Sequence, residues 1–267
     1  MRIGFLITAR LKSTRLPRKL LLDIGGRTVI EHVIDRAKLV SGIDEIILCT
    51  STDIQDDPLI DIADQEGISS FRGSPEDVLE RLLNASKTFQ LDQFVGITGE
   101  NALFSVQHAQ QMCTIVRAND PDYTYLKGLP IGCATYAAKV NALEVVCQIK
   151  KIVDTEIWGY LLNRPELFDI ECIDAELTNI DPKMRITLDH PEDEIFFRKV
   201  FDLMANKDLY DFNALLALID AHPELKNIHG HIEQTDLPGN IKEQIDDTFK
   251  KHYSEIMALK KKLYGGV

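Results

Sequence analysis

The chain has 267 residues, 42 of them acidic and 30 basic, and a net charge of -12. This length allows one large domain with a sizeable core, and the acidic balance argues against duplex nucleic acid as a partner. No apolar run approaches the roughly 20 residues that span a bilayer, the first residues lack the order of a signal peptide, and the five cysteines form no CxxC pair. We therefore expect a cytoplasmic protein with reduced thiols that binds neither nucleic acid nor a membrane.

Short apolar runs alternate with amphipathic stretches in the first half of the chain. The apolar runs predict strands over residues 2–9, 44–50, 68–72 and 93–98. Helical spacing predicts helices over 28–40, 58–67 and roughly 104–118, and one more that begins at Ser74, an N-cap serine followed by proline and acids. This alternation predicts an α/β fold with a mostly parallel central sheet. Ligands of such sheets bind at the carboxyl ends of the strands, which marks the loops 9–19, 50–57, 72–77 and 99–103.

The second half of the chain is less regular. Its patterns predict strands over 122–127, 134–140 and 184–189, and helices over 141–151, 154–163 and 191–204. From about residue 210, helical segments are interrupted by Pro223 and Pro238. We therefore expect a domain over residues 1–207 and a helical C-terminal extension over 208–267. The extension is a candidate surface for a dimer or another partner.

The loop after the first strand is the most informative part of the sequence. Between Thr8 and Lys19 it carries five cationic residues, and Pro17 argues against a helix there. Arg10, Arg15 and Lys19 would suit a polyphosphate, because arginine gives forked hydrogen bonds to phosphate oxygens and lysine gives a point charge. The alternative is a solvated basic loop in an acidic protein, and charge alone favours that alternative.

The order of the residues in this loop favours the phosphate-binding interpretation over the solvated basic loop. The segment from Arg10 to Lys19 resembles the R-x-x-S-T-R-L-P-G-K motif of the sugar-nucleotide cytidylyltransferases, the family of CMP-Kdo and CMP-sialic acid synthetases. It is most similar to the branch named after a spore coat polysaccharide biosynthesis protein. Only Arg18 departs from the motif, because the family has glycine there. The resemblance covers roughly residues 1–205 and continues through these stretches: Glu31–Val33, Asp44–Ile47, Phe71–Ser74, Glu76–Arg81, Ile97–Gly99, Asn163–Phe168 and Leu188–Asp193.

The resemblance implies a Rossmann-like nucleotidyltransferase fold and an activity. Members of the family transfer CMP from CTP to a sugar acid or related sugar and release pyrophosphate, in the synthesis of surface polysaccharide or glycoconjugate precursors. It implies that Arg10, Arg15 and Lys19 hold the triphosphate, and that backbone near Ala9 and Ser13 lies against the base. Positioning and charge neutralisation supply most of the catalysis in such a displacement. A homodimer is also expected, because enzymes of this family are often dimers.

The resemblance further implies Mg2+ held by two carboxylates. Asp189 matches one position, between a predicted strand and a helix start; an acid favoured by the helix dipole is the alternative. Glu100 follows Thr98 and Gly99 where the family has aspartate, so its longer side chain needs backbone movement or a bridging water to reach the metal. The histidines show no metal-ligand spacing, and we expect surface or structural roles for His32, His190, His229 and His231.

The acceptor region departs furthest from the family pattern. The family's R-E-H-V-T-P-Y run is replaced by Asp154–Tyr160, which loses a histidine and an arginine and gains Trp158. Trp158 is expected to stack on a sugar face, with a core or dimer-contact aromatic as the alternative. Arg72 is expected to contact substrate or phosphate, with an ion pair to Asp77 as the alternative. For Asp77 itself we expect a capping role.

Three other functions stay open. The same chemistry with another nucleoside triphosphate and a sugar-1-phosphate would fit the altered acceptor region. A nucleotide-binding or assembly protein that has lost catalysis would fit Arg18, Glu100 and the absence of the family's acidic residues at Ala134 and Tyr136. A glycosyltransferase would use a D-x-D metal motif, but residues 120–122 are expected to form a proline turn.

Overall fold

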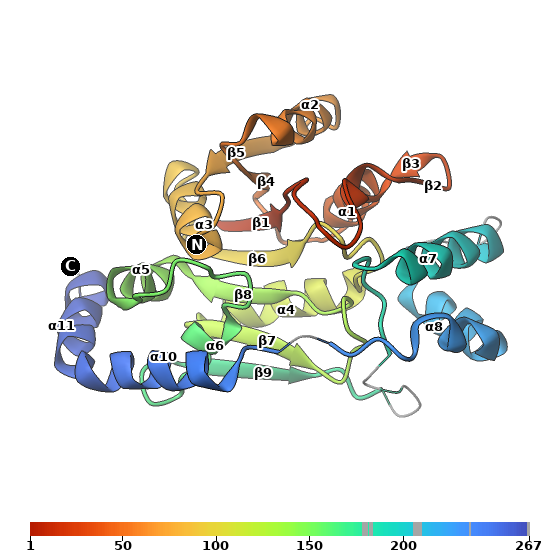
Figure 1. Cartoon of the computed structure of the whole chain (residues 1–267). Helices are drawn as coiled ribbons and strands as arrows, with labels where there is room; N and C mark the ends of the chain where they lie inside the picture. The colour runs from red at the N-terminus through yellow and green to blue at the C-terminus, as the bar shows by residue number, and fades with distance from the viewer. Residues whose placement is uncertain (178–180, 182–183, 205–209, 235, 266–267) are drawn as a thin grey trace.

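The computed structural model describes residues 1–177, 181, 184–204, 210–234 and 236–265. Its centre is a seven-stranded sheet in the order β5-β4-β1-β6-β8-β7-β9 (Figure 1). β8 runs antiparallel to both β6 and β7, and every other neighbouring pair is parallel. The mostly parallel α/β sheet expected from the sequence is therefore confirmed. The strands of the sheet are β1 (Ile3–Thr8), β4 (Glu45–Ser51), β5 (Ser69–Gly73), β6 (Gln93–Thr98), β7 (Tyr123–Lys127), β8 (Tyr136–Lys139) and β9 (Ile170–Asp174).

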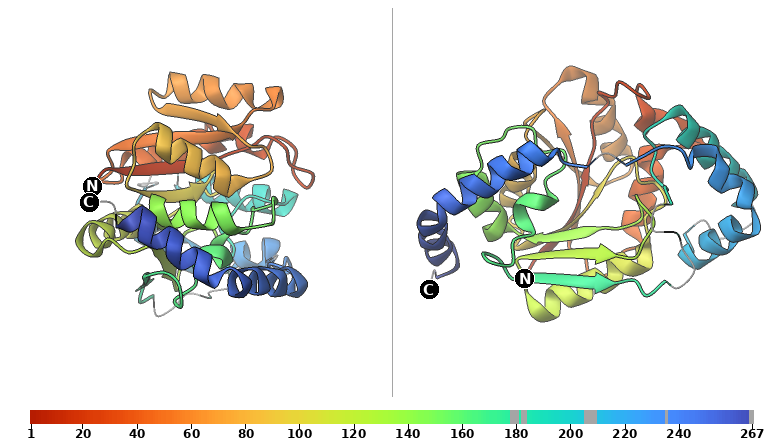
Figure 2. Two further views of the ribbon diagram at one scale, coloured as in Figure 1. Left: turned by 90° about the vertical axis from the view of Figure 1, so that its left-hand side faces the viewer. Right: turned by 60° about the horizontal axis from the view of Figure 1, so that its bottom comes forward.

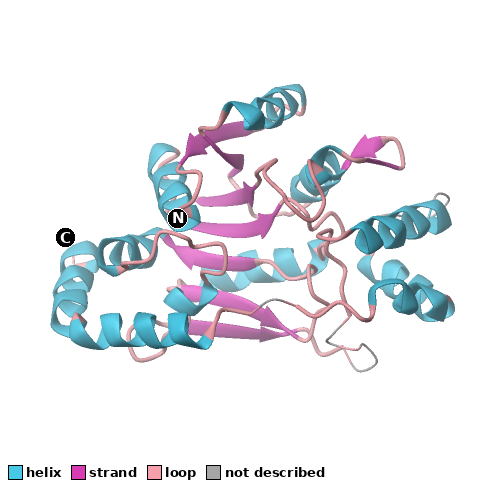
Figure 3. Ribbon diagram, in the orientation of Figure 1, coloured by secondary structure: helices cyan, strands magenta, loops and turns pink. Residues whose placement is uncertain are grey.

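Helices cover both faces of the sheet (Figure 3). Successive side chains of a strand point to opposite faces, and in β1 Phe5 and Ile7 belong to one core cluster while Leu6 belongs to the other. The first cluster includes α1 (Val29–Lys38), α2 (Asp57–Gln65), α4 (Val106–Asn119), α7 (Pro191–Met204) and α8 (Phe212–Ala221). The second includes α3 (Val78–Thr88), α5 (Val140–Ile149), α6 (Gly159–Leu162), α10 (Gly239–Lys251) and α11 (Tyr253–Tyr264).

Helix α3 begins later than the sequence predicts. Its N-cap is Asp77, whose side chain accepts a hydrogen bond from the backbone N–H of Glu80 at 3.1 Å. The Ser74 hydroxyl oxygen accepts from the N–H of Asp77 at 3.0 Å and so closes a turn ahead of the helix. The expected N-cap at Ser74 was therefore wrong by one turn, because two overlapping capping signals stand in S-P-E-D and the later one starts the helix.

Two other predicted elements are wrong. Residues 184–189 form no strand; Arg185 makes an isolated bridge to Ile131, and the N–H of Leu188 donates to the Glu100 carbonyl at 3.3 Å. These contacts attach the segment to loops instead of the sheet. The helix expected over 154–163 shrinks to the single turn α6, because the side chains of Lys150 and Thr155 bond to Asp77 and hold the preceding segment away from a helix. Strand β9 was not predicted.

The C-terminal extension packs in two separate places. α8 and α9 (Lys226–His229) contact α7, whereas α11 contacts α5. Figure 2 shows that these two places lie at opposite ends of the molecule and that the chain between α9 and α10 crosses from one to the other. Among the described residues, none of the helices combines the length and apolar character needed to cross a membrane.

Candidate active site

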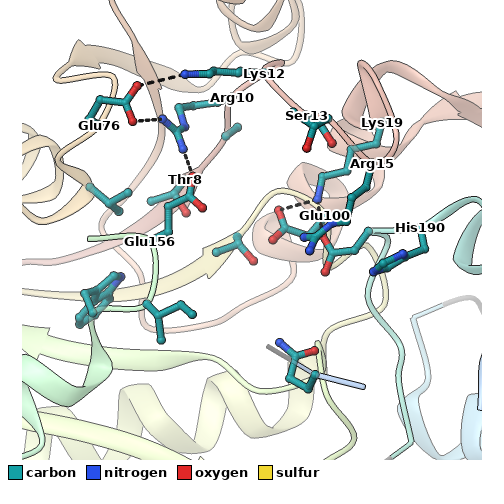
Figure 4. A pocket seen from close by; sticks show the side chains of 18 of the residues that line it. Thr8, Arg10, Lys12, Ser13, Arg15, Lys19, Glu76, Glu100, Glu156 and His190 are labelled. Atoms are coloured by element: carbon teal, nitrogen blue, oxygen red, sulfur yellow. Dashed lines mark hydrogen bonds and ion pairs between the residues drawn. The ribbon is translucent and has the colours of Figure 1, made fainter. Parts of the chain in front are cut away.

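A cavity of about 480 Å³ opens where β1 and β6 end. The loop that follows β1 supplies one wall, and the loops before α3 and α7 supply others (Figure 4). Of the four loops predicted from the sequence, the loop 9–19 therefore contributes most, while the loops 99–103 and 72–77 contribute Glu100 and Glu76. The lining includes the predicted residues Ala9, Arg10, Ser13, Arg15, Lys19, Glu100, Trp158 and Asp189.

One end of the cavity, which we call the Lys19 end, gathers Lys19, Arg15, Glu100 and Asp189. The Lys19 Nζ lies 2.6 Å from Asp189 Oδ1 and 4.0 Å from Glu100 Oε2. Arg15 approaches the same Asp189 oxygen at 3.7 Å. The side chains of Lys19 and Asp189 are 12% and 16% exposed, so their attraction is screened less than that of a surface pair. The two predicted metal carboxylates and two predicted phosphate cations thus converge.

Close backbone packing places Glu100. The N–H of Gly99 donates to the Thr8 carbonyl at 2.8 Å, which holds the turn after β6 against the end of β1. A Cβ at Gly99 would lie 3.1 Å from Ile30 Cδ1 and 3.2 Å from Ala9 Cβ, so a larger residue fits only if these neighbours shift. Together with the Leu188–Glu100 backbone bond, this brings the two carboxylates to the same edge.

Asp193 holds the backbone of Asp189 in place. Its Oδ2 accepts from the backbone N–H groups of Asp189 at 2.9 Å and His190 at 3.0 Å, and Arg185 lies 3.3 Å away. Its Oδ1 pairs with His229 Nδ1 at 2.9 Å. Burial opposes ionisation of this carboxyl, but the bonds from His229 and the two backbone N–H groups outweigh it and lower the pKa of Asp193 to about 2. The structural role expected for His229 is confirmed.

The loop 9–19 keeps its shape through three features. Arg18 adopts a left-handed backbone with φ 54°, a conformation that glycine accepts without strain, so the family's glycine at this position has a conformational reason. The Leu11 N–H donates to the buried Asp56 at 2.7 Å, and the Ser13 hydroxyl accepts from Leu16 at 3.4 Å. Asp56 was not identified from the sequence.

The opposite end of the cavity, which we call the Arg10 end, is built from Arg10, Lys12, Glu76 and Glu156. The Arg10 guanidinium bonds to the Pro75 carbonyl and to the Glu156 carboxylate, and lies 3.8 Å from Glu76. Lys12 pairs with Glu76 at 3.2 Å. Figure 4 shows these residues across the cavity from Lys19 and Arg15. The expected convergence of three cations therefore holds for Arg15 and Lys19, while Arg10 points elsewhere.

Trp158 is 5% exposed and lies between the core and the cavity. Its ring meets Tyr136 edge to face, with 4.6 Å between the ring centroids. Its packing therefore matches the alternative of a core aromatic, while part of its surface stays available to a ligand because it lines the cavity.

Arg72 is not part of the cavity lining. It pairs with Asp57 at 2.5 Å and donates to the carbonyls of Ser51 and Asp53 at 3.0 and 2.8 Å. These bonds tie the β4–α2 loop to β5. Asp77 has the capping role expected for it and also pairs with Lys150.

Sequence reasoning missed several residues that line the cavity. Arg185 and Arg81 are both buried, and Glu156, Glu233 and Gln234 also line the cavity, as does His190, for which we expected a surface or structural role. Arg185 stood in a predicted strand, and a cation one turn before a motif carboxylate was the signal that could have identified it. Nothing in the sequence marks Glu233 or Gln234, because their partners are distant in the chain.

The carboxylate pair fits magnesium. Mg2+ binds oxygen ligands, keeps several waters, and is commonly held by one or two carboxylates together with substrate phosphates. Glu100 and Asp189 supply such a pair, although no third histidine, cysteine, aspartate or glutamate joins them as a metal cluster within the described part of the chain. These residues therefore do not resemble a zinc or calcium site in which the protein supplies all the ligands.

Comparisons with known proteins identify the family. A model of the cytidylyltransferase family matches residues 5–212. The chain is 25% identical over 229 residues to the spore coat polysaccharide biosynthesis protein SpsF of Bacillus subtilis, covering 83% of this chain and 95% of that protein. It is 28% identical over 156 residues to the 3-deoxy-manno-octulosonate cytidylyltransferase of Escherichia coli, covering 56% and 57% of the two chains. A cytidylyltransferase structure from Leptospira borgpetersenii superposes with a TM-score of 0.78 at 25% identity, covering 89% of this chain and 100% of that chain.

Proposed function

This chain belongs to the cytidylyltransferase family, and on that premise we propose that it transfers CMP from CTP to a hydroxyl of a sugar acid or related sugar and releases pyrophosphate. The observation that carries the proposal is the Lys19 end, where two cations and two carboxylates meet at the ends of β1 and β6. The names of two relatives point to a sugar-acid acceptor and to polysaccharide synthesis.

The loop 9–19 would bind the nucleotide. Arg15 and Lys19 would hold phosphate oxygens, because both already lie within ion-pair reach of an oxygen anion, that of Asp189. Backbone near Ala9 and Ser13 would lie against the base. Arg10 would join the phosphates by leaving Glu156. Attack of the acceptor hydroxyl on the α-phosphorus forms the new P–O bond, the bond to pyrophosphate breaks, and the hydroxyl proton leaves to solvent or a nearby base.

Glu100 and Asp189 would hold Mg2+ beside the phosphates. The bound ion supplies charge neutralisation for the triphosphate and the leaving pyrophosphate. Lys19 offsets the charge of both carboxylates in the free protein. It would turn toward phosphate when nucleotide and metal enter together.

The test is a panel of CTP, UTP, GTP and ATP, each with and without magnesium. Calorimetry reports binding, and pyrophosphate release with a mixture of sugar acids and sugar phosphates reports turnover. We expect CTP-selective, magnesium-dependent binding and turnover with a sugar acid. Selective use of another triphosphate with a sugar phosphate would replace the CTP assignment. CTP binding without turnover on any acceptor would indicate a nucleotide-binding homologue that has lost catalysis, and no binding of any triphosphate would end the proposal.

The homodimer expected from the resemblance is part of the proposal. Light scattering of the purified chain tests it directly, with a mass of about twice 30.2 kDa expected. A monomeric mass would remove the dimer and leave the chemistry untouched, because every residue assigned above comes from one chain.

A further inference from the structure

The chain that follows α9 contributes to the cavity from outside the region that the family model matches. That match ends at residue 212, yet Glu233 and Gln234 line the same cavity as Asp189. The connection from α9 to α10 runs from one end of the molecule to the other (Figures 1 and 2). The cavity is therefore incomplete without a segment of the C-terminal extension.

Arg185 fixes the orientation of the Gln234 side chain. The Arg185 NH1 group donates to Gln234 Oε1 at 2.5 Å. A guanidinium group only donates hydrogen bonds, so the carboxamide oxygen must face Arg185. The NH2 group of Gln234 is then the part of the side chain that a ligand can use, and it can only donate.

Arg185 itself carries a donor that the protein does not use. The residue is 4% exposed, and its Nε has no hydrogen-bond partner among the residues that the structure describes. A buried donor without a partner is costly. Arg185 also lines the cavity, but its Nε has almost no accessible surface, so an oxygen atom of a bound ligand would reach this donor only after the side chain turns.

The position of this pair relative to Asp189 distinguishes it from the nucleotide-binding residues. Lys19 and Arg15 approach Asp189 Oδ1 at 2.6 and 3.7 Å. Arg185 approaches the other oxygen, Oδ2, at 3.7 Å. Arg185 and its partner Gln234 are therefore different groups from the two cations expected to hold the leaving pyrophosphate, and Arg185 approaches a different oxygen of Asp189.

We propose that Gln234 and Arg185 form the acceptor subsite, and that Gln234 is a specificity-determining residue that donates a hydrogen bond to an oxygen of the acceptor. The inference rests on the proposed function, since it assigns the acceptor of that reaction. Both available groups are donors, so they select an acceptor that offers oxygen atoms at this point, whether a carboxylate or a hydroxyl. A sugar acid and its neutral sugar counterpart distinguish the two sources.

The test compares Gln234→Glu with Gln234→Leu in the full-length chain. Gln234→Glu keeps an oxygen for Arg185 but loses the NH2 donor, whereas Gln234→Leu loses both. We expect each variant to raise the KM for the acceptor about tenfold, the usual scale for one lost hydrogen bond, with kcat and the KM for CTP within about twofold of wild type. Gln244→Glu and Gln244→Leu on α10 are the matched controls and should behave as wild type.

The probes are magnesium CTP with 3-deoxy-manno-octulosonate and a set of other sugar acids and their neutral counterparts. If Gln234 only supported Arg185, Gln234→Glu would behave as wild type, and that result would overturn the inference. An equal rise in the KM for CTP would do the same. Absence of wild-type turnover with every acceptor would remove the proposed function and the inference with it, whereas wild-type turnover with unaffected Gln234 variants would remove the inference alone.

Discussion

The two ends of the cavity use the same loop and the same residue types, but the protein holds them differently. At the Lys19 end, Asp189 is fixed by the buried Asp193 and Glu100 by the turn at Gly99. At the Arg10 end, the partner acids Glu76 and Glu156 have side chains 53% and 62% exposed. Exposed ion pairs contribute little stability, whereas groups held in place before binding lower the cost of ordering them. The Lys19 end is therefore prepared for chemistry, and the Arg10 end is free to rearrange.

The largest expected effect comes from removing the cation of the prepared end. Lys19→Ala should lower the rate of pyrophosphate release about 1000-fold, because a positioned charge on a transferring phosphate is worth several kcal/mol. Lys12→Ala is the control from the Arg10 end and should change the rate less than about threefold. Equal losses of rate in Lys19→Ala and Lys12→Ala would contradict the proposed difference between the two ends. Thermal unfolding checks that both variants fold.

Removing the support under the prepared end should cost stability. Asp193→Asn takes away a buried negative charge and leaves the neighbouring Arg185 with only its longer ion pair to Asp189. Breaking a buried pair of this kind costs about 3 kcal/mol, measured as the change in the free energy of unfolding in urea. Asp220→Asn, whose carboxylate pairs with Lys226 on the surface, is the control and should shift it by less than about 0.5 kcal/mol. A small change in Asp193→Asn would mean that the Lys19 end is not rigidly supported.

Substitutions of the two carboxylates, Asp189 and Glu100, should affect magnesium binding without affecting folding. Asp189→Asn should lower turnover about 100-fold and weaken the magnesium dependence of CTP binding, because an amide oxygen carries no charge to hold the ion. Glu100→Asp tests the longer side chain at the other position and should stay within about fivefold of wild type. A large gain in Glu100→Asp would instead identify glutamate as the cause of impaired catalysis. Calorimetry of CTP with and without magnesium measures both variants.

The same contrast explains what the sequence could and could not predict. Lys19 begins a 3-10 helix, Glu100 lies two residues after β6, and Asp189 lies two residues before α7. The motif and these nearby element ends were enough to predict that they share one edge, although the strand expected before Asp189 does not form. Arg10 belongs to the same motif, but its partner Glu156 is far along the chain, and no local pattern states that contact. Gln234 lies in an irregular connection whose place depends on where α8 and α10 pack. Sequence patterns report local structure, and long-range contacts between exposed side chains lie beyond them.

The smallest expected effect belongs to the Arg10 end and tests its freedom to rearrange. If Arg10 must leave Glu156 to reach phosphate, Glu156→Gln removes a competing anion and should tighten CTP binding about threefold, the scale of one partly exposed ion pair. Asp154→Asn, in the same loop and bonded to the Glu156 N–H at 3.2 Å, is the control and should leave the Kd unchanged. Higher salt should shrink the difference, because the competing pair is exposed and screened. Weaker CTP binding in Glu156→Gln would show that Glu156 orients Arg10 toward the nucleotide, and the Arg10 end would then be prepared in the same way as the Lys19 end.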